Sequence, residues 1–466
     1  MYGFVLYDLG FMALFILAVI LFLSTRKKNL QRQGVLYLYR TKIGINFINK
    51  FSKKFEKILR PLRYVIILSG MILMVSMIWL MIKSTYLYLK FPIARVIKAP
   101  PIAPIIPYFP KIFGLESFFP PLYFTYFVII LAIVIITHEF AHGIFAKLEN
   151  FKIHSTGFAF LGPILGAFVE PDEKQMAKAK KFPQMSVLAA GTFANIIMTI
   201  IFGLILLLFF SSFFVPAGVK FNSYAIAQIN TSDVIVIGNS TIAPEKYVEI
   251  KAYDRTFFAE KDTLKNSLEN NLPNVFVYYD SPAFREQIRG AITEIDGEKV
   301  TSMKSLSEVL QDYRPGDKVN VKTAILDPGQ GTVAERKEYE VELGNNDGKA
   351  FLGVGFLPVG SNGFLGKLYD KIFAKVKNPF VHYDSNIGGF GWFIYYLLWW
   401  IVFINFAVAL FNMLPLGILD GGRFFYLAIW AITGKENIGK KAFAGATWFI
   451  LGLLLLMMIK WAFTVF

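Results

Sequence analysis

Six long apolar segments, separated by polar or broken stretches, dominate the pattern of this chain. They cover about residues 3–24, 64–89, 121–148, 186–214, 391–414 and 443–466. Each is long enough to cross the ~30 Å hydrocarbon core of a bilayer as a helix. The pattern therefore predicts an α-helical polytopic membrane protein. No small-residue cleavage motif follows the first segment, so we interpret it as a retained span; a cleaved signal peptide is the alternative.

Two apolar stretches lack the continuity of a helix. Residues 90–120 are rich in proline (PPIAPIIPYFP) and predict an interfacial loop. GFAFLGPILGAFVEP, residues 157–171, is broken by glycine and proline, which favours a re-entrant or strand-like element. Such backbone is tolerated at membrane depth only where protein or a cavity satisfies its polar groups. From Phe221 onward, short β-prone runs alternate with turn residues and predict a small β-rich domain within the insert 215–385.

Composition supports a membrane protein and narrows its chemistry. Of the 466 residues, 55% are hydrophobic, and the mean hydropathy is +0.50, which is too apolar for an ordinary soluble chain of this length. Lys and Arg number 48 against 33 Asp and Glu, a formal net charge of +15. We assign this excess to cytoplasmic loops and expect no nucleic-acid partner, since no basic patch carries interleaved aromatics. The chain has no cysteine, so a transition metal must bind His, Asp or Glu.

The placement of the basic residues predicts the orientation of the spans. Residues 26–63 contain many Lys and Arg residues and a single acidic residue, Glu56; further basic clusters lie at 174–181 and 423–441. If all six segments cross, these three loops share the cytoplasmic side. The insert and both termini then lie outside the cytoplasm, in an integral protein of the cell (plasma) membrane. Whether the amphipathic basic stretch 41–63 lies on the inner membrane surface stays open.

The sequence HEFAH places two of the four histidines inside the third apolar segment. His138 and His142 are four residues apart, so a helix puts both imidazoles on one face, where they can bind zinc. Glu139 lies beside them, where a carboxylate can take a proton from water at the metal. The alternative is a pair of core histidines next to a buried acid. Burying an unpaired glutamate in lipid costs about 2–3 kcal/mol or more, which favours the metal site.

A catalytic zinc site needs a third protein ligand and one open position. His154 lies beyond the end of the helix, and His382 lies near the outer membrane face. Asp420, in FNMLPLGILDGGRFF, follows the fifth segment at a glycine-rich break that lets the chain turn back. At 1.5 Å per residue, His138 lies about 25 Å into the third span, and the fifth span ends about 35 Å in. Both depths are in the cytoplasmic half of the bilayer, so Asp420 is the predicted third ligand.

These motifs resemble those of the site-2 protease family of intramembrane metalloproteases. The resemblance rests on HEFAH at 138–142, LDGGR at 419–423, AAGTFANIIM at 189–198 and the glycine-broken GPILGAFVEPDE between the third and fourth spans. It covers most of residues 121–215 and 391–430. HExxH alone occurs in many metalloproteases, whereas its combination with a distant LDG motif on another span is much more specific.

The resemblance implies a residue-by-residue site. His138, His142 and Asp420 bind one Zn²⁺, and Glu139 is the general base. Asn195, within the fourth span, is implied to stabilise the oxyanion; the alternative is an interhelical hydrogen bond. The strand-like element 157–171 lies beside the site, and an extended substrate can add to it as a β-strand.

The insert carries a second resemblance, to the PDZ domains that site-2 proteases carry outside the membrane. SPA, GAITEIDGEKV, a short helix and PGDKV, ending in KAFLGVGF, place the PDZ-like domain at about 275–358. Such a domain binds peptides along a sheet edge, or it acts here as a size filter or spacer. Residues 221–274 have no parallel.

Together these features divide the chain into four parts: N-terminal spans and loops at 1–120, a first half of the catalytic core at 121–214, the insert at 215–385, and the second half of the core at 386–466. The predicted activity is hydrolysis of single-span membrane proteins in the bilayer. Alternatives are another HExxH membrane protease with a glutamate as third ligand, a zinc transporter, and an inactive scaffold that binds membrane proteins. Asn412 can orient a ligand or merely pack. The sequence names neither the substrate nor an oligomeric state.

Overall fold

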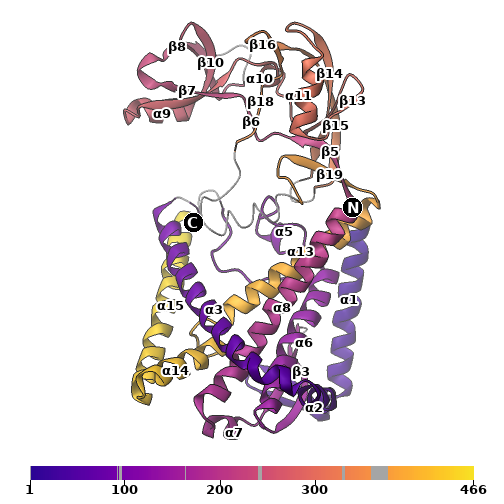
Figure 1. Cartoon of the computed structure of the whole chain (residues 1–466), viewed down its shortest axis with the longest axis vertical. Coiled ribbons are helices and arrows are strands. Elements are labelled where there is room, and N and C mark those ends of the chain that lie inside the picture. The colour runs from indigo at the N-terminus through magenta and orange to yellow at the C-terminus, as the bar shows by residue number, and fades with distance from the viewer. Residues whose placement is uncertain are drawn as a thin grey trace. The chain divides into compact units, whose positions relative to one another are not determined.

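The computed structural model of the chain describes residues 2–91, 93, 97–162, 164–239, 244–327, 331–357 and 376–465. These residues form two compact units (Figure 1). The first consists of Met1–Leu206 and Tyr395–Phe466, and the second of Leu207–Ile394. Each unit has hydrophobic clusters of its own.

Six helices of the described chain are long and apolar enough to cross a membrane, which confirms the predicted number. They are α1 (Tyr2–Thr25), α3 (Glu56–Lys90), α6 (Phe124–Leu148), α8 (Lys181–Phe213), α13 (Gly388–Phe411) and α15 (Glu436–Val465). Three of them, α3, α8 and α15, begin five or more residues before the predicted apolar segments. The first turns of these helices contain charged residues. A prediction based on apolar residues alone therefore places the start of each helix too late.

Four shorter helices complete the first unit: α2 (Ile45–Lys54), α5 (Phe109–Ile112), α7 (Glu173–Lys178) and α14 (Asp420–Thr433). A 3-10 turn, η1, covers Lys27–Asn29. The amphipathic α2 packs against α6: Ile48 is fully buried, and a Cβ on Gly143 would lie 2.8 Å from it. The ring of Phe47 lies 5.8 Å from that of Phe140. Helix α2 therefore supports the turn of α6 that carries the histidines.

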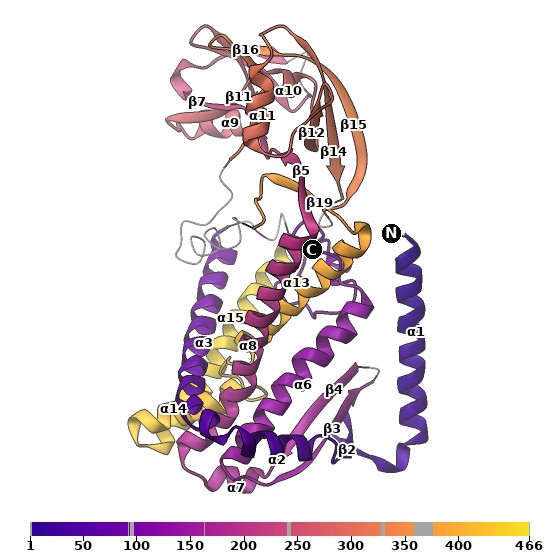
Figure 2. The same cartoon turned by 45° about the vertical axis from the view of Figure 1, so that its right-hand side comes forward.

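A four-stranded antiparallel sheet lies beside α6 (Figure 2). Its strands, in spatial order, are β1 (Leu30–Gln33), β2 (Leu36–Thr41), β3 (Ile153–Leu161) and β4 (Ile164–Pro171). The hairpin β3–β4 is the strand-like element predicted for residues 157–171. The β1–β2 hairpin was not predicted, because its short alternating pattern lies within a stretch dominated by basic residues. Strand β4 forms the edge of the sheet next to α6.

A buried carboxylate joins the N-terminal part of α1 to the start of α6. Asp8 is 1% exposed. It accepts hydrogen bonds from the backbone N–H groups of Phe124 and Thr125, at 2.7 and 2.8 Å, and from the hydroxyls of Thr125 and Tyr108, each at 2.6 Å. The first N–H groups of a helix have no partner within the helix, so Asp8 caps α6 from a neighbouring span. The predicted interfacial loop contributes Tyr108; residues 92 and 94–96 of that loop lie outside the described residues.

The second unit contains two main antiparallel sheets with short helices. One sheet has the order β7-β11-β10-β9-β8, and the other β15-β14-β12-β5-β19, with β13 paired to β12. The strands are β5 (Phe214–Lys220), β6 (Ser223–Tyr224), β7 (Ile226–Asn230), β8 (Ile235–Asn239), β9 (Tyr247–Ala252), β10 (Arg255–Glu260), β11 (Asn274–Tyr279), β12 (Ala291–Ile295), β13 (Glu298–Lys299), β14 (Lys318–Leu326), β15 (Val333–Glu342), β16 (Gly344–Asn346), β17 (Lys349–Phe351), β18 (Val354–Gly355) and β19 (Val381–Ser385). The helices are α9 (Lys261–Glu269), α10 (Pro282–Arg285) and α11 (Met303–Gln311), with a 3-10 turn, η2 (Thr231–Asp233).

This unit has the β-rich character predicted for the insert. Residues 221–274, for which the sequence offered no parallel, supply most of the five-stranded sheet and most of its core, including Ile250, Ala259 and Leu264. Strand β11, at the start of the predicted PDZ-like range, pairs with β7 and β10 in that sheet. Helix α11 starts at a capping box formed by Ser302 and Ser305, which matches the short helix predicted before Pro315.

Candidate metal centre

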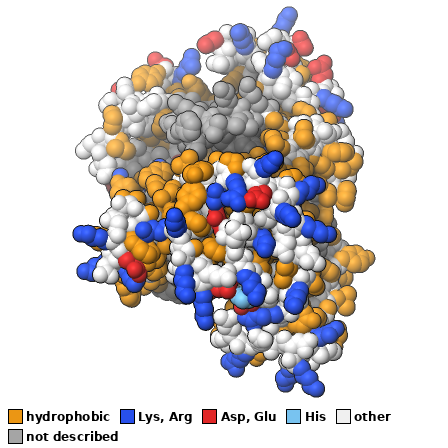
Figure 3. Space-filling model, turned by 60° about the horizontal axis from the view of Figure 1, so that its bottom comes forward, with side chains coloured by type: hydrophobic (Ala, Val, Ile, Leu, Met, Phe, Trp, Pro, Cys, Tyr) orange, Lys and Arg blue, Asp and Glu red, His pale blue; other side chains and the backbone are white. Residues whose placement is uncertain are grey.

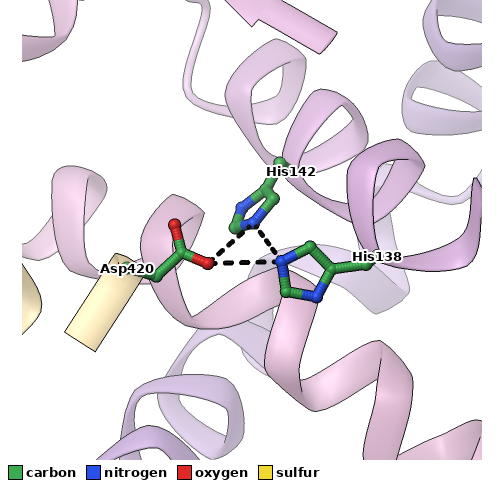
Figure 4. A group of neighbouring side chains, drawn as sticks. All are labelled: His138, His142 and Asp420. Atoms are coloured by element: carbon green, nitrogen blue, oxygen red, sulfur yellow. Dashed lines mark hydrogen bonds and ion pairs between the residues drawn. The ribbon is translucent and has the colours of Figure 1, made fainter. Parts of the chain in front are cut away.

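Three side chains from two helices meet at the C-terminal half of α6 (Figure 4). Nε2 of His138 lies 3.0 Å from Nε2 of His142, and Oδ2 of Asp420 lies 3.2 Å from each of these atoms. Figure 4 shows the two rings and one carboxylate oxygen pointing toward a common centre. The structure thus brings together the two histidines and the aspartate that the sequence indicated, although 278 positions of the chain, counting from His142 to Asp420, separate them.

The spacing of these atoms fits a small divalent cation. Ligands about 2.0–2.2 Å from a tetrahedral zinc ion lie about 3.3 Å from one another, close to the distances seen. Nδ1 of His142 lies 2.7 Å from the carbonyl oxygen of Val187. This ring nitrogen must donate, so Nε2 of the neutral ring carries a lone pair that faces the carboxylate. Two acceptors so close need a proton or a metal cation between them, and zinc fits a set of nitrogen and oxygen ligands.

Asp420 reaches the histidines because the chain folds back after α13. The N–H of Gly421 donates to the carbonyl oxygen of Asn412 at 2.7 Å. A Cβ on Gly421 would lie 2.3 Å from the backbone of Met413, and one on Gly422 would lie 2.2 Å from that of Leu416. Only glycine permits backbone segments to approach this closely. The two glycines of LDGG therefore let the first turn of α14 pack against the backbone of Met413 and Leu416, with Asp420 at the start of that helix.

Glu139 lies next to the ligands and contacts the edge of the sheet. Its Oε2 accepts a hydrogen bond from the N–H of Val169 on β4 at 3.0 Å. A cavity of about 330 Å³ opens beside the group, lined by Glu139, the three ligands and residues that include Val169, Pro171, Asn412 and Arg423. A carboxylate at this position can exchange a proton with a molecule held in the cavity.

Helix α8 forms the wall behind the imidazoles. A Cβ on Gly191 would lie 2.5 Å from Nε2 of His142 and 2.7 Å from Nε2 of His138, so this position admits only glycine. The side-chain amide of Asn195 lies 3.1 Å from Nδ1 of His138. Gly191 was missed at the sequence level: AAGTFAN marked the segment, but nothing in it showed which atoms would approach the glycine.

The other two histidines lie elsewhere in the described structure. His154 is half exposed and pairs with Asp172 at 3.3 Å. His382 is buried on β19 of the second unit and lies 3.2 Å from Asp384. Neither belongs to the group with metal-ligand spacing, which is consistent with the choice of Asp420 as the third candidate ligand.

Two carboxylates at the C-terminal end of β4, Glu170 and Asp172, are held by polar partners. Glu170, on β4, accepts from Nε of Arg40 at 2.9 Å and from the hydroxyl of Ser155 at 2.5 Å. The Arg40 guanidinium is the main reason that the pKa of the Glu170 carboxyl lies below its ordinary value, and Ser155 adds to the effect. A hydrogen bond from the backbone of Gln175 does the same for Asp172, which caps α7. Both carboxylates are thus ionised at neutral pH.

Comparison with known proteins places the centre within a wider match. Residues 126–459 match peptidase family M50. An uncharacterized protein of Methanocaldococcus jannaschii, MJ0971, is 25% identical over 412 residues, which cover 87% of this chain and 81% of that protein. The zinc metalloprotease RasP of Geobacillus kaustophilus is 38% identical over 72 residues, which cover 15% of this chain and 16% of RasP. The family match contains all the residues of the metal centre.

Proposed function

Because the chain belongs to peptidase family M50, the site-2 protease family of membrane metalloproteases, we propose that it is a zinc endopeptidase acting inside the bilayer. Its substrates, on this proposal, are single-span membrane proteins cut in or near their transmembrane segments. The observation that carries the proposal is the group His138, His142 and Asp420, whose ligand atoms lie within 4.8 Å of one another on helices of the apolar unit.

The roles of the residues follow from their positions. Zinc, when bound, supplies a Lewis acid that polarises a peptide carbonyl and makes water acidic enough to ionise near neutral pH. The two imidazoles and the Asp420 carboxylate would hold the ion beside the cavity that these three residues line. Glu139 takes the proton of the attacking water and passes it to the leaving amine. The oxyanion role of Asn195 stays a prediction, and the contact of its amide with Nδ1 of His138 favours another role.

The edge of β4 offers a place for an extended substrate. The N–H of Val169 points away from β3 and toward Glu139. In a strand, the N–H and C=O of one residue point to the same side, so the free edge of β4 faces the cavity, which Val169 and Pro171 line. An unwound segment that pairs with this edge lies beside the general base. Peptide bonds held in a helix are shielded by their own hydrogen bonds, so this pairing prepares the substrate for cleavage.

The proposed orientation puts the metal centre near the cytoplasmic face. Basic side chains gather on the end of the first unit seen in Figure 3, which includes the loops predicted to be cytoplasmic. This distribution supports the positive-inside assignment. Water then has a short path to the cavity. The same assignment places the insert and both termini on the outer side of the plasma membrane.

We propose that the insert is PDZ-like and screens substrates by size. Strands β11, β12 and β14 of the PDZ-like range are each paired on both sides. Strand β15 is an edge strand, but it carries exposed charges at Glu335, Arg336, Lys337, Glu338 and Glu340. Charged edges resist the addition of another strand. This supports a filter or spacer over a peptide-binding module.

A metal transporter and an inactive scaffold are the competing functions. A transporter needs ligand sets at successive depths, whereas the described residues contain a single group with ligand spacing. A scaffold does not need a carboxylate beside the metal ligands. Glu139 at that position therefore favours catalysis.

The decisive experiment compares wild type with Glu139→Gln, both reconstituted in vesicles with a single-span substrate. The proposal predicts that the variant keeps its zinc and loses cleavage by about 10²–10⁴-fold. Glu56→Gln is the matched control, because Glu56 contacts only Arg60 on the surface among the recorded ion pairs, and it should cleave normally. Zinc transfer into vesicles without cleavage would favour a transporter. Equal cleavage by wild type and Glu139→Gln would contradict the assigned general base.

A further inference from the structure

One face of α8 is built around the two imidazoles. Val187, Gly191 and Asn195 are spaced by four residues and therefore lie on the same side of the helix. The carbonyl of Val187 contacts His142, Gly191 leaves room for both rings, and the amide of Asn195 contacts His138. This face contacts Nδ1 of both rings, the nitrogen of each ring that points away from the metal centre. At Gly191 it leaves the room that both rings need.

The contact to His142 shows what such a partner does. Its Nδ1 donates to the Val187 carbonyl at 2.7 Å. A carbonyl can only accept, so the proton of the neutral ring is held on Nδ1 and the lone pair is left on Nε2. Metal-binding histidines commonly have a partner of this kind, which fixes the tautomer and the ring orientation and strengthens the ligand.

His138 needs the same arrangement, and Asn195 is the group in position to provide it. The amide Nδ2 lies 3.1 Å from Nδ1 of His138, while Oδ1 is buried without a hydrogen-bond partner among the described residues. A half-turn of the amide exchanges the two groups. Oδ1 then accepts from Nδ1–H, and Nε2 of His138 keeps its lone pair for the metal. With Nδ2 toward the ring, the proton would instead lie on Nε2 and block the ligand atom.

The location of Asn195 separates it from the reacting atoms. Its side chain is fully buried, and it is absent from the lining of the cavity. Asn412, by contrast, lines the cavity, and its Nδ2 lies 3.5 Å from Nε2 of His138. A donor to a developing oxyanion must lie within hydrogen-bond distance of the reacting carbonyl. Asn195 instead contacts the back of a ligand.

We propose that Asn195 is a positioning residue that acts through its amide oxygen: it fixes the tautomer and orientation of His138 and thereby sets the affinity of the site for zinc. The proposal rests on the zinc site of the proposed function. It assigns to Asn195 a role different from stabilising the oxyanion, and the two roles make opposite demands on the side chain. Positioning His138 requires an acceptor, whereas stabilising an oxyanion requires a donor.

The test measures zinc affinity by competition with a chelator in the full-length protein, alongside kcat and KM. Asn195→Leu removes both amide groups, and we expect zinc affinity to fall by about 10–100-fold. Asn195→Asp keeps an acceptor and loses the donor, so it should bind zinc about as tightly as wild type. The matched control is Asn405→Leu: Asn405 is also fully buried in a span but donates only to the carbonyl of Ile401, and its loss should leave zinc affinity unchanged.

Other outcomes would overturn the inference. Wild-type zinc affinity in both Asn195 variants, with kcat reduced in both, would assign the residue to the oxyanion. Equal losses of affinity in Asn195→Leu, Asn195→Asp and Asn405→Leu would indicate a general packing effect. The Asp variant keeps the test valid even if the Leu variant fails to fold. Failure of wild type to bind zinc would refute the proposed metal site itself, which the other outcomes leave intact.

Discussion

Two aspartates from other segments lie against opposite ends of helix α6, and their carboxylates lie in different surroundings. Near the N-terminal end of α6, the buried Asp8 accepts hydrogen bonds from two backbone N–H groups and two hydroxyls. Near the C-terminal end, the partly exposed Asp420 faces Nε2 of His138 and His142 at 3.2 Å. The protein itself satisfies the first carboxylate. The second carboxylate faces the Nε2 atoms of the two rings, which carry lone pairs when α8 holds the ring protons on Nδ1.

The difference separates a structural charge from a functional one. A charge inside a membrane protein is costly, so each requires compensation. Donors that belong to the fold make Asp8 a cap for α6 and a link between spans. At Asp420 the fold presents ligands and leaves the compensating charge to be supplied from outside. We conclude that burial of an acid does not by itself indicate a metal site; the partners of the acid do.

The largest expected effect comes from Asp420→Asn. The variant should lose stoichiometric zinc and cleave its substrate about 10³-fold more slowly or worse, since the metal supplies several kcal/mol of transition-state stabilisation. Metal analysis and cleavage rates check both parts. Stoichiometric zinc in Asp420→Asn would make the two aspartates alike and break the comparison.

Gly191→Ala tests whether the close packing of α8 against the two histidines is needed for metal binding. The added methyl would lie 2.5 Å from Nε2 of His142, and relief of such overpacking costs about 1–3 kcal/mol. We expect zinc affinity to fall by roughly 10–100-fold, because 1.4 kcal/mol corresponds to a factor of ten. Gly203→Ala on the same helix is the control, since a Cβ there has no neighbour within 4 Å. If both variants bind zinc like wild type, the close approach has no role in metal binding.

Asp8→Asn makes the same chemical change at the N-terminal end of α6 as Asp420→Asn makes at the metal centre. The N–H₂ group of the new amide then faces N–H and O–H groups that donated to the carboxylate. The free energy of unfolding should therefore fall by about 1–3 kcal/mol. Zinc content should stay at the wild-type level. Thermal melting in detergent, with and without chelator, measures the effect. Loss of zinc from Asp8→Asn would show that the contact between Asp8 and the start of α6 controls the metal centre.

The smallest effect is expected at Glu170, where the compensating charge is Arg40. The pKa of Glu170 is lowered in the folded protein, so its contribution to stability is present above the ordinary glutamate pKa of about 4.3 and is lost as the pH falls below it. Both side chains are partly exposed, which screens the pair. Arg40→Gln should therefore slightly flatten the fall of melting temperature between pH 5 and about pH 3. A melting curve with the same pH dependence as wild type would remove Glu170 from the comparison.

Much of the membrane unit could be predicted from the sequence, for specific physical reasons. Span number follows from apolar length, and the glycine-broken stretch 157–171 cannot continue a helix. His138 and His142 are neighbours through helical spacing alone. Asp420 was accessible because its depth and the glycines after it restrict where it can lie. Glu139 followed from its place between the two histidines, and the resemblance then added Asn195 as a candidate.

The features that the sequence did not reveal depend on contacts between distant segments. A single aspartate hardly changes the apolar character of the first span, so Asp8 gave no sign of its partners at Tyr108 and Thr125. In the sequence, Gly191 could not be told apart from any other glycine in a helix. The amide of Asn195 could be placed within a span, but the ring that it contacts lies on another helix. The pairing of β11 with β7 and β10 likewise depends on long-range register that short β-prone runs do not specify.

The most direct test of the central claim is X-ray absorption at the zinc edge of the purified, active protein, with zinc content measured on the same sample. The account predicts one zinc per chain, two imidazole nitrogens and at least one oxygen at about 2.0–2.2 Å, and no sulfur. It also predicts that Asp420→Asn loses this signal. Cleavage by wild-type protein that contains no metal, or an unchanged zinc shell in Asp420→Asn, would contradict the account.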